Sequence, residues 1–430
     1  MPSLLSATPS IAQSQSAALR SACGAHIVQD GLVALQYVLL PVLAQAMGLN
    51  YGQVGLLRAV SSTALSVLEI PAGLLAERTG ERRLLVVGLL AAGAGYIGVA
   101  SASGFIGIAL CFLLAGAGAA FQHSLSSAIV VSQFSGDNRR LALGRYNSAG
   151  DLGKLLFTGS FSFAVGAGLA WQVVVVGLAC VAIGFALIVG LVFRPANSAL
   201  ETDADDTLDT SGSVRSNPSD QSGTVNATSI PCAAATVPAG LAKRWGVQRP
   251  RGFIVLGAVV YLDSTVQSVF LTFLAFVLLS KGASASIAAT GVTIALAGGM
   301  AGKLIGGTLA ARLGDRRAFR LIQVLTIIAL MALLVLPLSA VLLLLPLTGL
   351  VVQGSSTVSY GSVADYLDVG RSSRGYSLIY TLAGFSSITG PLMAGVLADW
   401  FGLSAALLLA VGLITLTLPL ARVMSSGLAR

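Results

Sequence analysis

Charge is scarce in this sequence. Of its 430 residues, only 10% are Asp, Glu, Lys or Arg, whereas 55% are hydrophobic. A water-soluble globule of this size needs more polar surface, so the composition excludes an ordinary soluble protein and favours a lipid bilayer. The formal net charge is +8, but the basic residues are placed in short connections between apolar runs. This placement does not indicate a nucleic-acid partner.

Reactive residues and large aromatic side chains are also few. The cysteines have no C-x-x-C spacing and are Cys23, Cys111, Cys180 and Cys232. They predict neither a disulfide nor a metal site. No paired nucleophile and base and no nucleotide-binding glycine loop occurs, so we expect no enzyme, no ATP-driven pump and no cofactor. Aromatic residues make up 7% of the chain against 50 glycines, which is typical of closely packed membrane helices.

Apolar runs fill most of the chain. A run of about 20 apolar residues is long enough to span a bilayer. Twelve such runs occur, at residues 21–47, 52–76, 83–101, 104–133, 143–168, 171–193, 252–280, 285–311, 318–338, 341–364, 375–398 and 402–421. Alternate connections carry arginines, whereas the opposite ones contain essentially only Lys281. The positive-inside rule therefore predicts that both termini are cytoplasmic.

Composition also divides the chain into four parts. Residues 1–19 are expected to form a disordered cytoplasmic tail, and residues 20–194 an N-terminal bundle of six helices. Residues 195–250 are rich in Ser, Thr, Asp and Pro, which predicts a flexible cytoplasmic linker. Residues 251–430 are expected to form a second six-helix bundle.

An eleven-residue segment occurs twice, once in each half. GLLAERTGERR, from Gly73 to Arg83, returns 234 positions later as GTLAARLGDRR, from Gly307 to Arg317, with seven letters identical. Each copy lies between two apolar runs. A weaker repeat is LAW at Leu169–Trp171 against LADW at Leu397–Trp400. The two halves are therefore predicted to be pseudo-symmetric, an arrangement typical of transporters.

Six spans, a linker and six spans with matching hinges resemble the major facilitator superfamily, whose loop motif is G-x-L-A-D-R-x-G-R-R. The resemblance implies an all-α membrane protein with twelve transmembrane helices in two bundles. It further implies a monomer in the cytoplasmic (inner) membrane of a bacterium. In this superfamily the first, fourth, seventh and tenth helices line a central cavity, and every third helix faces lipid. The third, sixth, ninth and twelfth spans here carry no charge in their bodies.

Charges in the other spans identify candidate functional residues, because a bare charge at mid-bilayer costs about 2.5 to 3.5 kcal/mol on insertion scales. His26 and Asp30 are four residues apart and share one face of the first span. A carboxylate beside an imidazole can hold and pass a proton. The pair is therefore our leading candidate for proton coupling. The alternative is a structural pair that joins the first helix to a neighbour.

The fourth and fifth spans offer further candidates. Gln122 and His123 follow a run of small residues and either contact substrate or protons or are satisfied core residues. Asp151 and Lys154 are three residues apart and can simply neutralise each other within one helix. Alternatively they form an ion pair that separates when the bundles move, or bind a charged metabolite.

Candidates in the C-terminal half are sparser. Asp263 has no basic residue nearby in its own span and is a candidate second proton carrier, with Gln267 one turn further on. Tyr360 is a weaker candidate for the cavity. Arg58 and Lys303 lie towards the ends of their spans, and we interpret both as side chains that extend to the membrane interface.

The repeated hinge is predicted to take part in gating. Its glycines allow close packing and a tight reversal, and Glu77 can pair with arginines or face a helix N-terminus. The corresponding position in the second copy is Ala311, so this acidic gate is one-sided. The gating residues predicted are Gly73, Glu77, Arg78, Gly80, Arg82 and Arg83 in the first copy, and Gly307, Arg312, Gly314, Arg316 and Arg317 in the second.

The motifs also resemble the fosmidomycin-resistance-like branch of the drug exporters. Members share a histidine and an aspartate four residues apart in the first helix, and a histidine soon after a G-x-G in the fourth. His26, Asp30, Gly116, Gly118 and His123 match these places. The resemblance implies a proton-coupled exporter of a small polar or drug-like molecule. A symporter or uniporter that imports a small organic acid or sugar remains open, as does a membrane scaffold or sensor.

Overall fold

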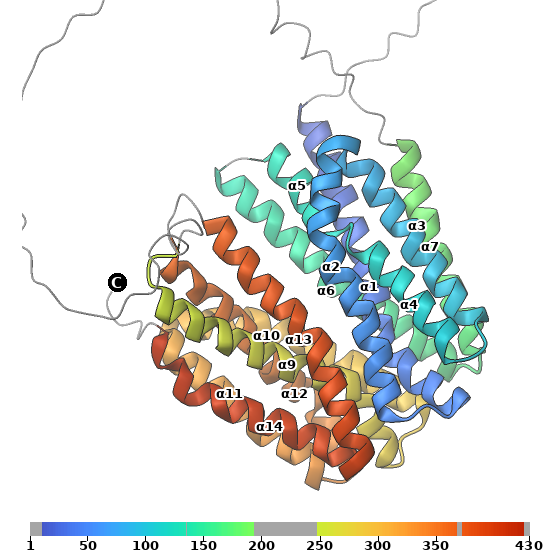
Figure 1. The fold of residues 1–430 in the computed structure, drawn as a ribbon, viewed down its shortest axis with the longest axis vertical. Helices are drawn as coiled ribbons and strands as arrows, with labels where there is room; N and C mark the ends of the chain where they lie inside the picture. Colours follow the sequence, from blue (N-terminus) through green and yellow to red (C-terminus); the bar gives the residue numbers. More distant parts are fainter. Residues whose placement is uncertain (1–10, 135, 193–246, 368–371, 425–430) are drawn as a thin grey trace, which may run out of the picture.

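The computed structural model describes residues 11–134, 136–192, 247–367 and 372–424. Its helices form two bundles that meet at one end and diverge at the other (Figure 1). The N-terminal bundle contains α1 (Ile11–Met47), α2 (Tyr51–Thr79), α3 (Glu81–Ser101), α4 (Phe105–Ala119), α5 (His123–Gln133), α6 (Gly136–Gly166) and α7 (Trp171–Val192). The C-terminal bundle contains α9 (Pro250–Ser280), α10 (Ala285–Leu313), α11 (Asp315–Val335), α12 (Leu338–Gly361), η1 (Ser362–Tyr366), α13 (Ser372–Phe401), α14 (Leu403–Leu420) and η3 (Ala421–Val423).

Each predicted span coincides with one helix or with a pair of helices in the same order, with three differences. The helix α1 begins at Ile11, so the part of the expected tail after residue 10 is helical. The fourth span is divided, because α4 ends at Ala119 and α5 begins only at His123. The fifth span belongs to a longer helix, α6. Ten helices of the described chain are long and apolar enough to cross a membrane, and α4 is a shorter apolar helix.

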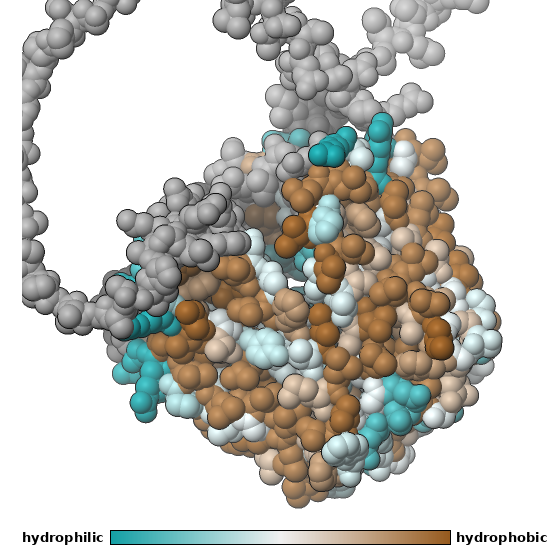
Figure 2. Space-filling view, in the orientation of Figure 1, coloured by the Kyte–Doolittle hydropathy of each residue, from teal (hydrophilic) through white to brown (hydrophobic). Residues whose placement is uncertain are grey.

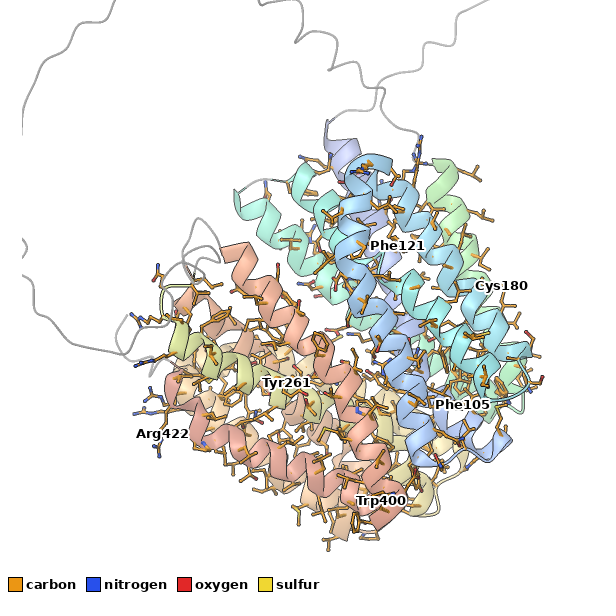
Figure 3. The ribbon with its side chains drawn as sticks, in the orientation of Figure 1. Phe105, Phe121, Cys180, Tyr261, Trp400 and Arg422 are labelled. Carbon is orange, nitrogen blue, oxygen red and sulfur yellow. The ribbon has the colours of Figure 1, made fainter. Side chains whose placement is uncertain are left out.

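The molecule has two distinct ends. The hinge end is the end at which both copies of the repeated motif lie, after α2 and after α10. The far end is the opposite one, where α1 is followed by α2 and α13 by α14. Figure 3 labels Arg422 at the hinge end of the C-terminal bundle and Trp400 at its far end. The bundles diverge towards the hinge end (Figure 1).

The outer surface is apolar, as a lipid-facing surface must be. Large hydrophobic side chains are widely exposed on it, among them Ile106, Phe163, Leu191 and Leu343, which are 73 to 83% exposed. Figure 2 shows this hydrophobic colour over both bundles, with hydrophilic residues gathered mainly towards the ends. Such a surface is unsuitable for water and indicates contact with hydrocarbon.

Small residues allow the helices to approach closely. Gly298, Gly302 and Gly306 form a stripe on α10 with four-residue spacing, and each faces the backbone of α12. A Cβ atom at Gly302 would overlap the carbonyl oxygen of Leu350. Because lipid tails provide little hydrophobic drive for association, such close backbone packing is a main source of stability.

Substitution of Gly302 tests this packing. Gly302→Ala adds a methyl group where the α12 backbone leaves no room, so we expect a loss of about 1 to 3 kcal/mol. The measurement is the melting temperature of the detergent-solubilised protein. The control is Gly412→Ala in α14, where an added Cβ meets nothing within 4 Å. Equal melting temperatures for the two variants would contradict the packing argument.

Candidate functional site

A cavity of about 530 Å³ lies between the two bundles. Side chains from both bundles line it. They are His26, Asp30, Tyr37, His123, Asn147, Asp151 and Lys154 from the N-terminal half, and Ser264, Gln267, Ser268, Leu271, Lys303, Gln353, Ser356, Thr357, Tyr360, Tyr380, Ala383 and Ser387 from the C-terminal half. None of these residues comes from α3, α7, α11 or α14, as the distribution of charge along the chain predicted.

Helical periodicity brings the lining residues together. On α9 they are Ser264, Gln267, Ser268 and Leu271, with spacings of three, four and seven residues. On α12 the same spacings recur in Gln353, Ser356, Thr357 and Tyr360. Residues at these intervals share one face of a helix. Each helix therefore presents one polar stripe to the cavity.

The two walls differ in chemistry. Acids, a lysine and both histidines come from α1, α5 and α6, whereas the C-terminal wall consists mainly of hydroxyl and amide side chains. Among the described lining residues, Lys303 is the one lysine or acid on that wall. Most charge in the cavity is therefore carried by the N-terminal bundle.

Asp30 is the centre of a cluster of basic groups. Its carboxylate oxygens lie 3.3 Å from His26 Nε2, 3.2 Å from Lys154 Nζ and 3.6 Å from His123 Nε2. Asp30 is 7% exposed, so these contacts are only weakly screened by water. The division of the fourth span places His123 at the start of α5, within reach of Asp30. The predicted pair of His26 and Asp30 is confirmed as a contact.

The contacts of His26 determine how it can carry a proton. Its Nδ1 lies 2.8 Å from the carbonyl oxygen of Tyr146, and a carbonyl oxygen can only accept, so Nδ1 carries a hydrogen. The other nitrogen, Nε2, faces Asp30. A proton on either His26 Nε2 or the Asp30 carboxyl group would join the two by a hydrogen bond, which is the arrangement that a proton-coupling pair requires.

Asp151 connects the two bundles. It accepts a hydrogen bond from Lys154 at 3.0 Å within α6, and two from Lys303 of α10 at 2.7 and 2.9 Å. The interpretation of Lys303 as an interface-seeking side chain is therefore wrong, because a carboxylate across the cavity holds its ammonium group. The view that Asp151 and Lys154 only neutralise each other is also incomplete. Acid and base alternate from Asp30 through Lys154 and Asp151 to Lys303.

His26, Asp30 and His123 also have the composition of a metal site. Their potential ligand atoms lie within 4.8 Å of one another. However, the Lys154 ammonium lies 3.2 Å from Asp30 and already holds the same carboxylate. A cation would have to displace Lys154 and would be repelled by it, so the residues do not fit a resident metal.

Asp263 lies behind the cavity wall and not in it. It is 1% exposed and accepts hydrogen bonds from Gln267 at 3.0 Å, Gln323 at 2.8 Å and Ser355 at 2.8 and 3.0 Å. These partners come from α9, α11 and α12. The network joins three helices of the C-terminal bundle. Gln323 was not singled out from the sequence, because an amide in an uncharged span gives little signal.

Gln122 and Tyr360 have different surroundings. Gln122 is buried, is not among the residues that line the cavity, and donates to the Tyr146 hydroxyl at 3.0 Å, which favours the alternative of a core residue. The same Tyr146 stacks on His26, with ring centroids 4.2 Å apart. Tyr360 lines the cavity, as predicted, and stacks on Tyr380 of α13 at 5.3 Å.

The hinge arginines stabilise each bundle separately. Arg82 donates to the carbonyl oxygens of Val189 and Gly190 at the end of α7. Its counterpart Arg316 donates to the carbonyl oxygens of Arg422 and Met424, just after α14. Both therefore satisfy carbonyl groups that a helix end leaves free.

The contacts of the other predicted gating residues do not indicate a role in gating. Gly80 and Gly314 have φ angles of +86° and +79°, which suits glycine. Arg78, Arg83, Arg312 and Arg317 are exposed, and Gly73 and Gly307 are half-buried. The Glu77 side chain lies outside the described residues. The gating role of the hinge stays a prediction.

At the far end, Asp399 joins the bundles. Its carboxylate accepts hydrogen bonds from the backbone N–H groups of Tyr51 and Gly52, both at 2.8 Å. These are the first N–H groups of α2, and a helix leaves such groups without internal partners. In the sequence, Asp399 is marked only as the extra residue of LADW relative to LAW. Nearby, Gly55 of α2 faces the carbonyl group of Pro391 in α13.

A double-mutant cycle measures the contact of Asp151 with Lys303. We expect Asp151→Asn and Lys303→Gln to show a coupling energy of about 1 to 2 kcal/mol in thermal unfolding, since the pair is only partly exposed. The control cycle pairs Asp151→Asn with Lys281→Gln, because Lys281 caps the end of α11 far from Asp151. Additive effects in both cycles would refute the inter-bundle contact.

Comparisons with known proteins agree with this geometry. The chain matches the Major Facilitator Superfamily over residues 22–277 and 253–425. An uncharacterised MFS-type transporter of Bacillus subtilis, YfnC, is 29% identical over 131 residues, which are 30% of this chain and 32% of that protein. The chain thus spans about a third of the length of this curated relative.

Solved structures share the fold at low identity. A bacterial homologue of the human lysosomal transporter Spinster, in an inward-facing and unoccupied conformation, has a TM-score of 0.75 at 15% identity, covering 96% of this chain and 98% of that one. A mutant of the nucleoside transporter NupG has a TM-score of 0.71 at 13% identity, covering 94% and 98%. The chain belongs to the Major Facilitator Superfamily and is a multi-pass membrane protein.

Proposed function

We propose that this protein is a proton-coupled secondary transporter that exports a small polar or drug-like molecule by alternating access. The observation that carries the proposal is the cluster around Asp30 in a cavity shared by both bundles. His26 and Asp30 both line that cavity, so a proton bound between them can exchange with it. The match of His26, Asp30 and His123 to the fosmidomycin-resistance-like exporters supports the same direction of transport.

Competition for Lys154 provides the coupling. When the shared proton leaves, Asp30 keeps its full negative charge and attracts Lys154 strongly. When a proton binds, this attraction weakens, and Lys154 interacts more strongly with Asp151, which it already contacts at 3.0 Å. Lys154 then competes more strongly with Lys303 for this carboxylate, which loosens the contact between the bundles. Protonation is thus linked to movement of one bundle relative to the other.

The orientation follows from the arginines. They gather at the hinge end, so this end is cytoplasmic by the positive-inside rule, as are both termini in a bacterial inner membrane. The cavity then faces the cytoplasm, and the bundles touch at the outer end through Asp399 and α2. Export requires that this outer contact opens while the hinge end closes.

The proton pair is tested by Asp30→Asn. A compound that raises the melting temperature in a ligand library is reconstituted with the protein in proteoliposomes, and its movement is followed under an imposed pH gradient. We expect Asp30→Asn to abolish uphill movement, a loss of at least about 100-fold. Movement down the compound's own gradient continues, because the cavity remains.

The control is Asp365→Asn, which removes an exposed acid in η1 outside the cavity. Uphill transport that survives Asp30→Asn would contradict proton coupling at this site. The exporter predicts that a pH gradient of one sign drives the compound out. If the same gradient instead causes the compound to accumulate, the importing symporter is favoured. The absence of any flux would favour a scaffold or sensor.

The outer contact is tested by Asp399→Asn. Neutralising the carboxylate weakens two charge-assisted hydrogen bonds to the α2 N-terminus, so the far end should open more often. We expect the population with an open far end to rise about 5- to 30-fold, for a loss of about 1 to 2 kcal/mol. This population is measured by electron paramagnetic resonance, from the distances between spin labels at Ala46 and Ser404.

Asn50→Ala serves as the matched control. Asn50 also caps α2, by accepting from the N–H group of Gln53, but it belongs to the same bundle. This variant should weaken the helix end without opening the far end. If both variants shift the distances equally, Asp399 is only a helix cap and not a gate.

A further inference from the structure

Arg58 carries a buried positive charge that the proposed transport mechanism leaves without a role. It is 5% exposed and lies in α2, so its predicted extension to the interface is wrong. Its guanidinium donates to the Gln36 amide oxygen at 2.6 Å and to the Tyr37 hydroxyl at 2.9 Å. Both acceptors are neutral, and no described carboxylate forms an ion pair with it. An unbalanced charge inside a membrane protein is costly and marks a functional site.

The direction of these hydrogen bonds is fixed. A guanidinium can only donate, so the Tyr37 hydroxyl oxygen accepts from Arg58 and its own hydrogen points elsewhere. No described residue accepts that hydrogen, and Tyr37 lines the cavity. On the other side, Gln36 accepts from Arg58 and donates to Ser61 at 2.8 Å, which holds the amide in this orientation. Arg58 therefore polarises the hydroxyl group of a residue that lines the cavity.

Tyr37 occupies a different part of the cavity from the proton pair. It lies seven residues beyond Asp30 on α1, which is about 10 Å towards the far end. The bundles meet at the far end, so Tyr37 marks the closed end of the cavity. The Arg58 guanidinium carbon lies 4.7 Å from the centre of the Tyr37 ring, directly behind this wall.

The balance of charge indicates what binds there. Asp30 and Asp151 are matched by Lys154 and Lys303, so these four groups neutralise one another. Asp263, another buried acid, has three neutral donors in the opposite bundle and does not line the cavity. Among the described residues, no acid lies within ion-pair distance of Arg58 to balance its positive charge.

We infer that the closed end of the cavity binds the anionic group of the substrate, and that the substrate is a small organic acid. Its carboxylate accepts the Tyr37 hydrogen bond and balances Arg58. The polar stripes of α9 and α12 hold the rest of the molecule. This inference rests on the proposed transport function and adds the chemical class of the substrate to it.

The experiment uses small aliphatic and aromatic carboxylates, each matched with its primary amide. Binding is measured by thermal shift on the full-length protein in detergent, without any gradient. We expect carboxylates to raise the melting temperature and the amides to have little effect. For the best carboxylate, Tyr37→Phe and Arg58→Gln should weaken the apparent Kd by about 10- to 100-fold.

Tyr261→Phe is the control, because the Tyr261 hydroxyl lies on α9, shares a hydrogen bond with Thr389 and does not line the cavity. It should leave the Kd unchanged. If Arg58→Gln does not fold, Tyr37→Phe decides alone. The inference is overturned if no carboxylate binds, if amides bind as well as their acids, or if Tyr37→Phe acts no more strongly than Tyr261→Phe.

The outcome is separable from that of the transport proposal. Gradient-driven transport with no preference for acids over amides overturns only the inference about the substrate. A clear preference for acids without gradient-driven transport overturns only the transport proposal.

Discussion

A charged side chain within a membrane-spanning helix must find its partners inside the protein, because hydrocarbon offers none. The arrangement of the cavity depends on this constraint. Asp30 and Asp151 are surrounded by two lysines and two histidines, and Asp263 is held by two amides and a hydroxyl. Among the described residues, the hydrogen-bond acceptors of Arg58 are neutral. The cluster of Asp30 and Asp151 joins the bundles, and the network of Asp263 holds one bundle together. The charge of Arg58 is the one that we infer to bind the substrate.

Free backbone groups at helix ends impose a similar requirement, and its solution differs between the two ends of the molecule. At the hinge end, Arg82 and Arg316 cap helices of their own bundle. At the far end, Asp399 of one bundle caps α2 of the other. Caps within a bundle keep it rigid, whereas a cap between bundles must break when they separate. The far end is therefore where movement has an energetic cost in this conformation.

Sequence periodicity predicted much of this fold. Twelve apolar runs gave the helices, and four-residue spacing placed His26 beside Asp30. These predictions succeeded because they depend on neighbours along one helix. The interpretation of Arg58 and Lys303 failed because it used only the depth of each residue in its own span. Depth does not say whether a side chain faces lipid or the partner bundle.

The sequence by itself determined the number and order of spans, the two-fold repeat and the concentration of charge in the N-terminal half, since composition and periodicity are local properties. Only the tertiary structure decided which charges meet. Asp151 and Lys303 are 152 positions apart, and Tyr51 and Asp399 are 348 apart. Such contacts depend on how two bundles pack, and that packing follows from small residues at many helix crossings together, which no single stretch of sequence records.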